Sequence, residues 1–588
     1  MFQQVLDPIF GSLALSAVFA ALPLVLLFVL LGVFKVKAPF AALAALGLSL
    51  VLAIIGWGMP VTQALSATAA GVVYGIFPIM WILANALWVY KLTVATPWFA
   101  TFGRTIRSIS NDLRILSILI AFCFGALLES LAGFGAPVAI SAAMLIAAGM
   151  KPLKSAIVSL MANTAPVAFG AMAAPIFALA GVTGLPVSDL AAMAGRQTPF
   201  IAMFVPLLLV VMVDGKRGLR QTWPVALVAG ITFGAAQFLT ANYFAVELTD
   251  VVASVLTMVA VLVMLRFWQP AEIIGMHDHD DVEGAGEPVP HEHTHEEELV
   301  QVGATNPAGS DNGGTSKAHT AQPGLAAQAL ATADLSDSTR PAPGKILMSV
   351  APYLIIMTIF SIAQIPMIKD WLAINGSVTF RWPGLDVVNP SGGPVASEEF
   401  HLDHLRAPGT LLFISGLIIM ALYKINVRKA LAIYWATLKQ LRWTIVTVTA
   451  VLGLSFVMNL SGQTNSLGVA LASAGGFFVL LSPVIGWIGV ALTGSDTSSN
   501  SLFGLLQVTA ANEVGLPAVL MAAANSSAGV LGKMLSLQNL AVAAAAVGLE
   551  GSENTLFRKL LPWSLGMLVF ITILIVLQST AVLGWMVP

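Results

Sequence analysis

Long apolar segments separated by short polar connections dominate this chain. Many windows of about 20 residues carry no charge, and that is the length with which an α-helix crosses the hydrocarbon core of a bilayer. The pattern predicts an all-α, polytopic membrane protein with about 12–14 transmembrane segments. The predicted apolar segments are Ser12–Phe34, Pro39–Trp57, Ala69–Tyr90, Ile115–Met150, Ser155–Ala180, Pro199–Val213, Trp223–Tyr243, Val251–Trp268, Ile346–Met367, Pro408–Tyr423, Trp443–Leu460, Leu467–Leu481 and Leu561–Val587.

Composition agrees with this pattern. Of the 588 residues 57% are hydrophobic and only 10% are charged, whereas soluble domains carry about 25% charged residues. The formal net charge is -2, and the basic residues fall between apolar segments instead of on one face, which argues against a nucleic-acid partner. The single cysteine, Cys123, lies in an apolar run and is expected to pack there.

The composition changes between residues 269 and 344. This stretch is rich in Ala, Gly, Pro, Ser, Thr and acidic residues and has few large apolar side chains, as in disordered segments. We therefore expect a first transmembrane half at residues 1–268, a disordered cytoplasmic His-rich and acidic linker at 269–344, and a second transmembrane half at 345–588.

Basic residues concentrate in alternate connections, which orients the chain under the positive-inside rule. The rule predicts an outer amino terminus and a cytoplasmic linker. Part of the basic stretch from Lys424 to Arg442 suits an interfacial amphipathic helix. The predicted cytoplasmic basic residues are Lys35, Lys37, Lys91, Arg104, Arg107, Arg114, Lys151, Lys154, Lys216, Arg217, Arg220, Arg266, Lys424, Arg428, Lys429, Lys439, Arg442, Arg558 and Lys559, against Arg196, Lys369, Arg381 and Arg406 outside.

One apolar stretch, Gly125–Ala139, contains a lone carboxylate, Glu129. A charge at mid-bilayer costs about 2.5–3.5 kcal/mol on insertion scales, so such residues face a cavity, pair with a partner or carry protons. Gly133, Gly135 and Pro137 interrupt the helix, and a broken helix at membrane depth is tolerated where it lines protein or water. The sequence predicts a re-entrant or broken segment here, with its bend near Leu131–Pro137.

A similar arrangement recurs in the second half. Glu129 is followed by Asn163 and Thr164, and Asp496 is followed by Asn525 and Ser526, with small residues around each. Inverted repeats with discontinuous helices at corresponding places indicate a transporter's binding site. The alternative is that the small residues only allow close helix packing. We favour two inverted-repeat halves with broken or re-entrant helices at the site.

These residues have distinct candidate roles. Glu129 and Asp496 are candidates for proton or cation coupling, because a buried carboxylate binds a proton or a cation readily. Lys533 either pairs with a substrate carboxylate or extends its ammonium group to the interface, and Arg196 is a further possible ligand or an outer-loop anchor. The candidate substrate-binding residues are Gly133, Gly135, Asn163, Thr164, Thr497, Ser498, Ser499, Asn525, Ser526 and Lys533.

Catalytic and metal-binding alternatives have weaker support. The linker histidines, in HDHDD and HEHTHEEE, lack the spacing of a closed structural metal site, so we expect a solvated segment. All eight histidines lie in the linker or near His401 and His404, which disfavours an intramembrane hydrolase. We expect no cofactor, no metal and no enzymatic activity.

Several motifs resemble the lactate permease family of bacterial plasma membranes, which includes glycolate permeases. They are YKLTVA at 90–95, AGFGAPVA at 132–139, ANTAPVAFGA at 162–171, AGRQ at 194–197 and LTGSDTSSN at 492–500. The resemblance implies proton-coupled uptake of L-lactate, D-lactate or glycolate across the inner membrane. The acidic, His-rich linker departs from the family pattern.

The resulting hypothesis is a secondary symporter that moves a monocarboxylate with a proton. A sodium-coupled carrier of another small organic anion and an ion channel are the alternatives. The order of preference among lactate enantiomers and glycolate stays open, because discrimination by one methyl group is worth only about 1–3 kcal/mol and depends on pocket shape. The oligomeric state stays open as well.

Overall fold

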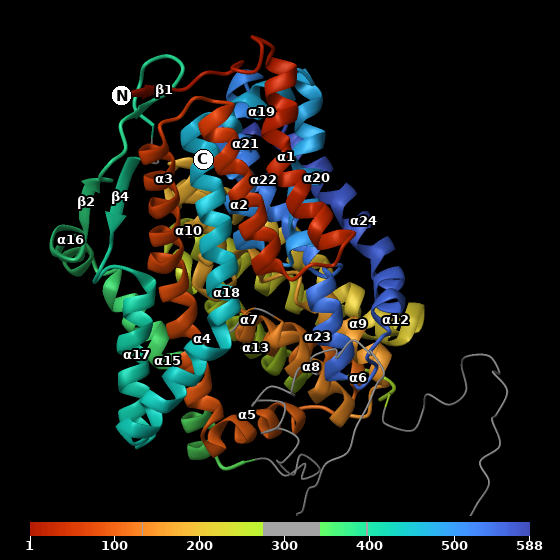
Figure 1. Ribbon diagram of the computed structural model, residues 1–588. Coiled ribbons are helices and arrows are strands. Elements are labelled where there is room, and N and C mark those ends of the chain that lie inside the picture. The colour runs from red at the N-terminus through yellow and green to blue at the C-terminus, as the bar shows by residue number, and fades with distance from the viewer. Residues whose placement is uncertain (132, 134, 275–340, 396–397) are drawn as a thin grey trace, which may run out of the picture.

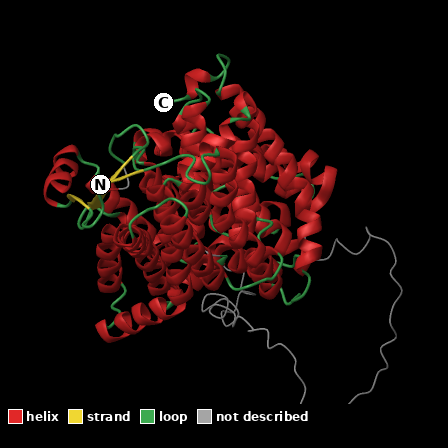
Figure 2. Ribbon diagram, turned by 45° about the horizontal axis from the view of Figure 1, so that its top comes forward, coloured by secondary structure: helices red, strands yellow, loops and turns green. Residues whose placement is uncertain are grey.

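The computed structural model describes residues 1–131, 133, 135–274, 341–395 and 398–588. Within these ranges the chain is a bundle of helices with two small pairs of strands at its edge (Figure 1, Figure 2). Eleven helices are long and apolar enough to span a membrane, or twelve when a bent pair is counted as one more span. The all-α polytopic fold is confirmed, at the lower end of the expected number of spans. Most of the predicted linker lies outside the described residues.

The first two helices form where the apolar runs predict them, whereas the third predicted run is divided between two helices, the first of which begins at Val61, before the predicted Ala69. Ser12 caps the first helix by accepting a hydrogen bond from the Leu15 amide, and Pro39 stands in the first turn of the second, where a missing amide proton costs nothing. The third and fourth helices are joined through a π-helical segment and interrupted at Phe77, whose backbone is extended. The elements are α1 (Leu13–Gly32), α2 (Ala38–Ile55), α3 (Val61–Tyr74), η1 (Gly75–Met80) and α4 (Trp81–Val94).

The next segment contains the predicted re-entrant hairpin. A short helix α5 lies across the end of the bundle in Figure 1, and a buried span follows and stops at Leu131. The returning helix has 12 residues, about 18 Å, which is too short to cross a bilayer. The elements are α5 (Pro97–Arg107), α6 (Leu113–Leu116), η2 (Ser117–Phe124), α7 (Gly125–Leu131) and α8 (Ala136–Ala147).

A second break divides the following apolar run. Its two parts meet at 63° between Ala162 and Val167, where the sequence places Asn163, Thr164 and Pro166. A later helix is interrupted at Asp214 and Gly215, so it contains both predicted spans. The elements are α9 (Pro152–Ala162), η3 (Val167–Phe169), α10 (Gly170–Thr183), α11 (Val187–Ala194), α12 (Thr198–Tyr243), η4 (Val246–Leu248) and α13 (Thr249–Phe267).

The second half begins with one span, α15, and continues through a polar connection that holds the strands to the shorter apolar helix α17. The sequence predicts a loop for this connection, but in the structure β2 and β4 pair antiparallel, and β3 pairs with β1 at the amino terminus. The basic stretch forms no separate helix, because from Val427 onward it belongs to one continuous helix of 35 residues. The elements are β1 (Phe2–Gln3), α15 (Pro343–Ala363), α16 (Pro366–Asn375), β2 (Val378–Arg381), β3 (Val387–Val388), β4 (Glu399–Leu402), α17 (Pro408–Leu422) and α18 (Val427–Ser461).

Two boundaries in the last segment also differ from the prediction. The span predicted at Leu467–Leu481 is wrong, because the first helix ends at Ala472 and a new one begins at Phe478, after a turn at Ser473 and Ala474 and the 3₁₀ segment Gly475–Phe477. The terminal helix ends at Gln578, before the predicted Val587. The elements are α19 (Gln463–Ala472), η6 (Gly475–Phe477), α20 (Phe478–Thr493), α21 (Asp496–Glu513), α22 (Ala518–Lys533), α23 (Leu537–Ala546), α24 (Glu553–Gln578) and η7 (Gly584–Met586).

The two halves of the sequence interleave in space. Helix α18 packs against α2 and α3, α21 against α10, and α23 against α8 (Figure 1). At Gly71 a Cβ atom would come within 2.5 Å of the Leu452 carbonyl oxygen, so only glycine permits this approach of α3 to α18. Polar residues near one break therefore meet residues from the other half of the chain.

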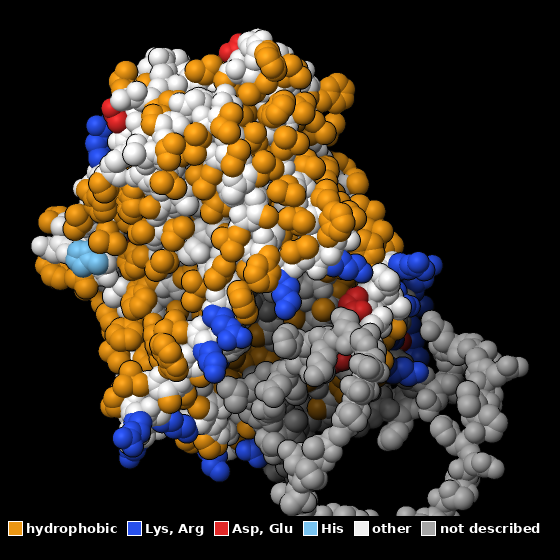
Figure 3. Space-filling view, in the orientation of Figure 1, with side chains coloured by type: hydrophobic (Ala, Val, Ile, Leu, Met, Phe, Trp, Pro, Cys, Tyr) orange, Lys and Arg blue, Asp and Glu red, His pale blue; other side chains and the backbone are white. Residues whose placement is uncertain are grey.

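The surface divides as expected for a membrane protein. Apolar side chains cover the flank seen in Figure 3, and Lys and Arg side chains gather toward the end of the molecule at which the chain leaves the described residues. This distribution is consistent with the positive-inside prediction, in which that end is cytoplasmic.

Candidate functional site

A buried ion pair joins the two halves at the centre of the candidate site. Lys533, the last residue of α22, donates from Nζ to Glu129 Oε1 on α7. The two residues are 7% and 2% exposed. Removing two charges from water costs several kcal/mol per ion, and this cost is offset only by close pairing and further hydrogen bonds. Glu129 Oε2 has no hydrogen-bond partner among the described residues, so the pairing is incomplete.

The glycines of the first break make room for this carboxylate. Gly133 and Gly135 have φ of +46° and +82°, a left-handed conformation that glycine adopts without strain. A Cβ at Gly170, where α10 begins, would lie 3.0 Å from Glu129 Oε1. Glu129 therefore occupies a space that exists because residue 170 lacks a side chain.

The break between α9 and α10 places two polar side chains beside Lys533. Asn163 and Thr164 are 4% and 1% exposed, and Asn163 Oδ1 and Thr164 Oγ1 lack hydrogen-bond partners among the described residues. An unpartnered buried polar atom costs about 1–3 kcal/mol. Both residues therefore have hydrogen-bonding capacity available for a ligand.

These residues line a narrow cleft of about 160 Å³ of empty space. The cleft is too narrow to hold a water molecule in this conformation, so its walls must separate before a ligand enters. Its described lining residues are Val138, Leu160, Asn163, Thr164, Lys533, Met534 and Asn539.

The second acid, Asp496, lies at the first turn of α21 after a break at Gly494. Its Oδ2 accepts hydrogen bonds from Ser526 Oγ at 2.6 Å and from Asn500 Nδ2 at 3.3 Å. Its Oδ1 has no partner among the described residues, and a Cβ at Gly529 would lie 2.8 Å from it. Glu129 and Asp496 thus both abut a glycine and keep one oxygen unpaired.

A network of amides supports Asp496. Asn525 donates from Nδ2 to Asn500 Oδ1 at 2.9 Å, and Gln507 donates from Nε2 to Asn525 Oδ1 at 3.2 Å. Asn500 also donates to the Pro175 carbonyl at 3.1 Å, which ties α21 to α10. The i, i+4 spacing of Asp496 and Asn500 was a signal that they share a helix face, yet Asn500 and Gln507 were not predicted as site residues.

The predicted second Asn-containing break is wrong. Helix α22 runs without interruption through Asn525 and Ser526 to Lys533, because residues 518–533 contain no proline and their glycines stay helical. The breaks of the second half lie at Gly494 and after Lys533 instead. Each half therefore has an acid and a nearby Asn. In the first half the helix breaks at that residue, Asn163, whereas in the second half the helix continues through Asn525.

Three predicted residues lie apart from the ion pair. Thr497 and Ser498 stand in the first turn of α21, where the Ser498 amide donates to Ser495 Oγ at 3.2 Å and the Thr497 carbonyl accepts from Ser501 Oγ. Ser499 is closer to the amide network, with its Oγ 3.5 Å from Asn525 Nδ2. The hydroxyl that caps α21 belongs to Ser495, and the Ser499 hydroxyl donates to the Gly486 carbonyl.

Arg196 lies away from both acids, at the end of the bundle that carries the carboxyl terminus. Its Nε donates to Asn242 Oδ1 and its NH1 group donates to the Met586 carbonyl, both at 2.8 Å. It therefore connects the start of α12 to the end of the same helix and to the carboxyl-terminal segment. These contacts fit the anchor interpretation.

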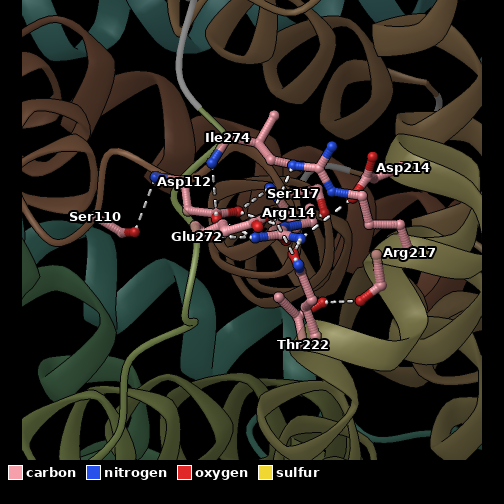
Figure 4. Close-up of polar contacts among 11 residues, drawn as sticks. Ser110, Asp112, Arg114, Ser117, Asp214, Arg217, Thr222, Glu272 and Ile274 are labelled. Atoms are coloured by element: carbon pink, nitrogen blue, oxygen red, sulfur yellow. Dashed lines mark hydrogen bonds and ion pairs between the residues drawn. The ribbon is translucent and has the colours of Figure 1, made fainter. Parts of the chain in front are cut away.

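A separate polar cluster lies at the start of the span Leu113–Leu131, at the end remote from Glu129. Arg114 is fully buried and binds Asp112, Asp214, Gln221 and the Glu272 carbonyl (Figure 4). Because α6 begins here and continues to Glu129, the cluster positions the base of the span that carries the acid. The side chain of Glu272 accepts from Arg217 and Gln221, each at 2.9 Å.

The buried breaks, the ion pair and the spanning helices together define a polytopic membrane transport protein. The profile of the L-lactate permease family matches residues 16–301 and 317–582. The chain belongs to the L-lactate permease family, which confirms the resemblance found in its sequence.

Curated relatives align along the whole chain. It is 37% identical to an L-lactate permease of Bacillus subtilis (strain 168), over 100% of this chain and 99% of the relative. It is also 37% identical to the glycolate permease GlcA of Escherichia coli (strain K12), over 98% of each, and 36% identical to an L-lactate permease of that strain over 100% of each. A solved structure of Neisseria gonorrhoeae MtrF, described among antimetabolite efflux pumps, gives a TM-score of 0.44 at 13% identity, over 88% of this chain and 84% of that one. That similarity is too low to define a shared fold.

Proposed function

We propose that this protein takes up L-lactate, and also D-lactate and glycolate, together with protons across the bacterial plasma membrane. The observation that carries this proposal is the buried pair of Lys533 and Glu129 beside a cleft with unpartnered polar atoms. An ammonium group suits a substrate carboxylate, and a neighbouring acid suits a proton. The names of the relatives supply the substrate class.

Competition for Lys533 couples the two ligands. A substrate carboxylate that binds Lys533 displaces Glu129, which then stands buried without its counter-charge. An uncompensated buried charge is strongly destabilising, by about 3–5 kcal/mol, so Glu129 takes up a proton. The site then holds one ammonium, one substrate carboxylate and one neutral acid, and its net charge is the same as before. Loaded and empty carriers therefore face similar costs in changing conformation.

The remaining donors and acceptors suit a 2-hydroxy acid. Thr164 Oγ1 and Asn163 Oδ1 lie beside Lys533 in the cleft and lack partners among the described residues. A substrate hydroxyl that donates to one of them satisfies a buried acceptor, whereas an analogue without the hydroxyl leaves it unpaired. The site is therefore expected to prefer lactate and glycolate over propionate and acetate.

Sodium coupling is the second candidate, and the surroundings of Asp496 favour it. Asp496 Oδ1 is buried and unpartnered among the described residues, as is Ser527 Oγ on α22, the helix whose Ser526 binds Asp496. Oxygen donors of this kind bind hard cations. Under this alternative Asp496 would hold sodium and Glu129 would stay charged.

Uptake by reconstituted protein tests both candidates. Proteoliposomes with an inward proton gradient should accumulate labelled L-lactate faster than vesicles at symmetric pH, and replacement of sodium by choline at fixed pH should not change the rate. Competition by a panel of short acids with and without a 2-hydroxy group ranks the substrates. Equal uptake with and without the gradient would reject proton coupling, and large single-channel currents would indicate a channel.

A further inference from the structure

A third buried acid, Asp250, is not used by the mechanism above. It lies in the first turn of α13 and is fully buried. Its Oδ1 accepts a hydrogen bond from Gln237 Nε2 at 3.1 Å, and its Oδ2 has no hydrogen-bond partner among the described residues. No cation of the described chain forms an ion pair with it. Burying a carboxyl group without a counter-charge costs much less free energy when the group is neutral than when it is ionised.

Gln237 connects this acid to the candidate site. Its Nε2 also lies 3.4 Å from the carbonyl oxygen of Ala165, in the break that carries Asn163 and Thr164. Its Oε1 accepts from Thr198 Oγ1 at 3.1 Å, which fixes the orientation of the amide. The Gln237 amide nitrogen therefore bridges the Asp250 carboxyl group and the Ala165 carbonyl, and this bridge fixes the position of Asp250 relative to the broken helix.

Helix α13 packs against α7, the helix of Glu129. Asp250 and Glu129 therefore lie on two helices that pack against each other. Asp250 stands at the end of α13 remote from Arg266, and therefore at the end of the bundle that the positive-inside rule assigns to the outer side. With that orientation, protons enter during uptake from the end of the bundle at which Asp250 stands.

Few other titratable groups lie on the elements packed against α13, and none on α10. Apart from Glu129 they belong to η2, η4, α12 and α15: Cys123, Glu247, Asp214, Lys216, Arg217, Arg220, Tyr243, Lys345 and Tyr353. Among the groups on these elements, Glu129 is the buried acid of the candidate site, where it pairs with Lys533. The two carboxyl groups are therefore the relevant pair for a proton transfer.

We propose that Asp250 is a proton-holding residue that passes protons from the outer side to Glu129. In the transfer the O–H bond of the Asp250 carboxyl breaks and one forms on Glu129, so the negative charge moves from Glu129 to Asp250. A proton from the outer medium then restores neutral Asp250. This inference rests on the proposed proton coupling and assigns it an entry residue.

The test compares net uptake with exchange in proteoliposomes that contain the full-length protein. Asp250→Asn should reduce uptake driven by a proton gradient by about tenfold or more. Exchange of labelled for unlabelled L-lactate at equal acidic pH should stay within about twofold of wild type, because a carrier that stays protonated needs no proton entry. Asp189→Asn is the matched control, because it alters an acid in the first turn of α11 whose side chain accepts a hydrogen bond from the neighbouring Ser188 hydroxyl.

The outcomes separate this inference from the function it rests on. Gradient-driven uptake by Asp250→Asn at the wild-type rate and pH profile would overturn it, and so would an equal loss of uptake and exchange in a folded variant. If Asp250→Asn does not fold, Asp250→Glu replaces it: a shifted pH profile supports the inference and an unshifted profile overturns it. If the rate of wild-type uptake is the same with and without the proton gradient, the proposed proton coupling is rejected.

Discussion

Lys533 and Glu129 form a buried ion pair although 404 residues separate them in the chain. The pair connects α22 of the second half to α7 of the first. The Glu129 carboxylate and the Lys533 ammonium group are in direct contact, beside a cleft that is closed in this conformation. In the proposed mechanism the substrate carboxylate replaces Glu129 as the partner of Lys533, and Glu129 then takes up a proton.

Loss of either partner should impair both folding and transport. Glu129→Gln leaves the Lys533 ammonium buried without a counter-charge, a change that costs about 3–5 kcal/mol. We expect a lower melting temperature and loss of proton-driven lactate accumulation. The double variant Glu129→Gln with Lys533→Met should recover thermal stability without recovering transport. Accumulation at the wild-type rate in Glu129→Gln would remove this acid from the mechanism.

The glycines beside the two acids should not tolerate alanine. In Gly170→Ala the new methyl group meets Glu129 Oε1 at 3.0 Å, and in Gly529→Ala it meets Asp496 Oδ1 at 2.8 Å and Val490. Each carboxylate must shift, so we expect uptake to fall by about tenfold, the effect of 1.4 kcal/mol on the transport barrier.

Gly566→Ala is the matched control for these glycines. It lies in α24, where an added Cβ has no neighbour within 4 Å, and alanine favours a helix over glycine by about 1 kcal/mol. The control should retain uptake. An equal loss of uptake in all three variants would show that the loss does not arise from contact with the acids.

The contact of Glu272 with Gln221 and Arg217 should depend on pH. The Gln221 hydrogen bond and then the Arg217 charge hold the pKa of Glu272 below its usual value of 4.5. Since the folded-state pKa is lowered, the stabilisation is present above pH 4.5 and is lost as the pH falls through the lowered pKa. At neutral pH the contact is therefore intact.

Glu272→Gln should release this contact at neutral pH. Hydrogen exchange should then rise at the backbone amides near Ile274, whose N–H donates to Asp112 Oδ2 at 3.2 Å. Glu513→Gln, an exposed substitution at the end of α21, should leave this exchange unchanged. Unchanged exchange in Glu272→Gln would show that the bonds of the segment to Asp112, Leu113 and Arg114 hold it without the Glu272 side chain.

Arg196 is expected to support stability more than transport. Arg196→Ala removes hydrogen bonds to Asn242 and to the Met586 carbonyl, and a bond to a charged group contributes about 1.5–3 kcal/mol. The melting temperature should fall, while the KM for L-lactate stays at the wild-type value. A raised KM with unchanged melting would instead place Arg196 in the substrate path.

Local signals in the sequence predicted the breaks of the first half. Gly133, Gly135 and Pro137 forbid a continuous helix, and Asn163 and Pro166 do the same in the next apolar run, so hydropathy and helix chemistry were sufficient. The same reasoning failed for Asn525, because a small polar residue also fits inside a packed helix. The turn at Ser473 and Ala474 was missed because apolar residues flank it on both sides.

The partners within the site depend on long-range packing and were not predictable. Lys533 meets Glu129, and Asn500 meets the Pro175 carbonyl, only because α21 and α22 pack against elements of the first half. Asp250 stands near a predicted span boundary, where an exposed acid is ordinary, so its position in the sequence does not indicate a buried carboxyl group. Its burial follows from the packing of α12 and α13.

Proton uptake on substrate binding tests the central claim most directly. Calorimetric titration of the purified protein with L-lactate, in buffers of different ionisation enthalpy, counts the protons taken up when the substrate displaces Glu129 from Lys533. We expect a binding heat that depends on the buffer for wild type and is independent of the buffer for Glu129→Gln. A wild-type heat that is the same in every buffer, or an identical dependence in Glu129→Gln, would contradict it.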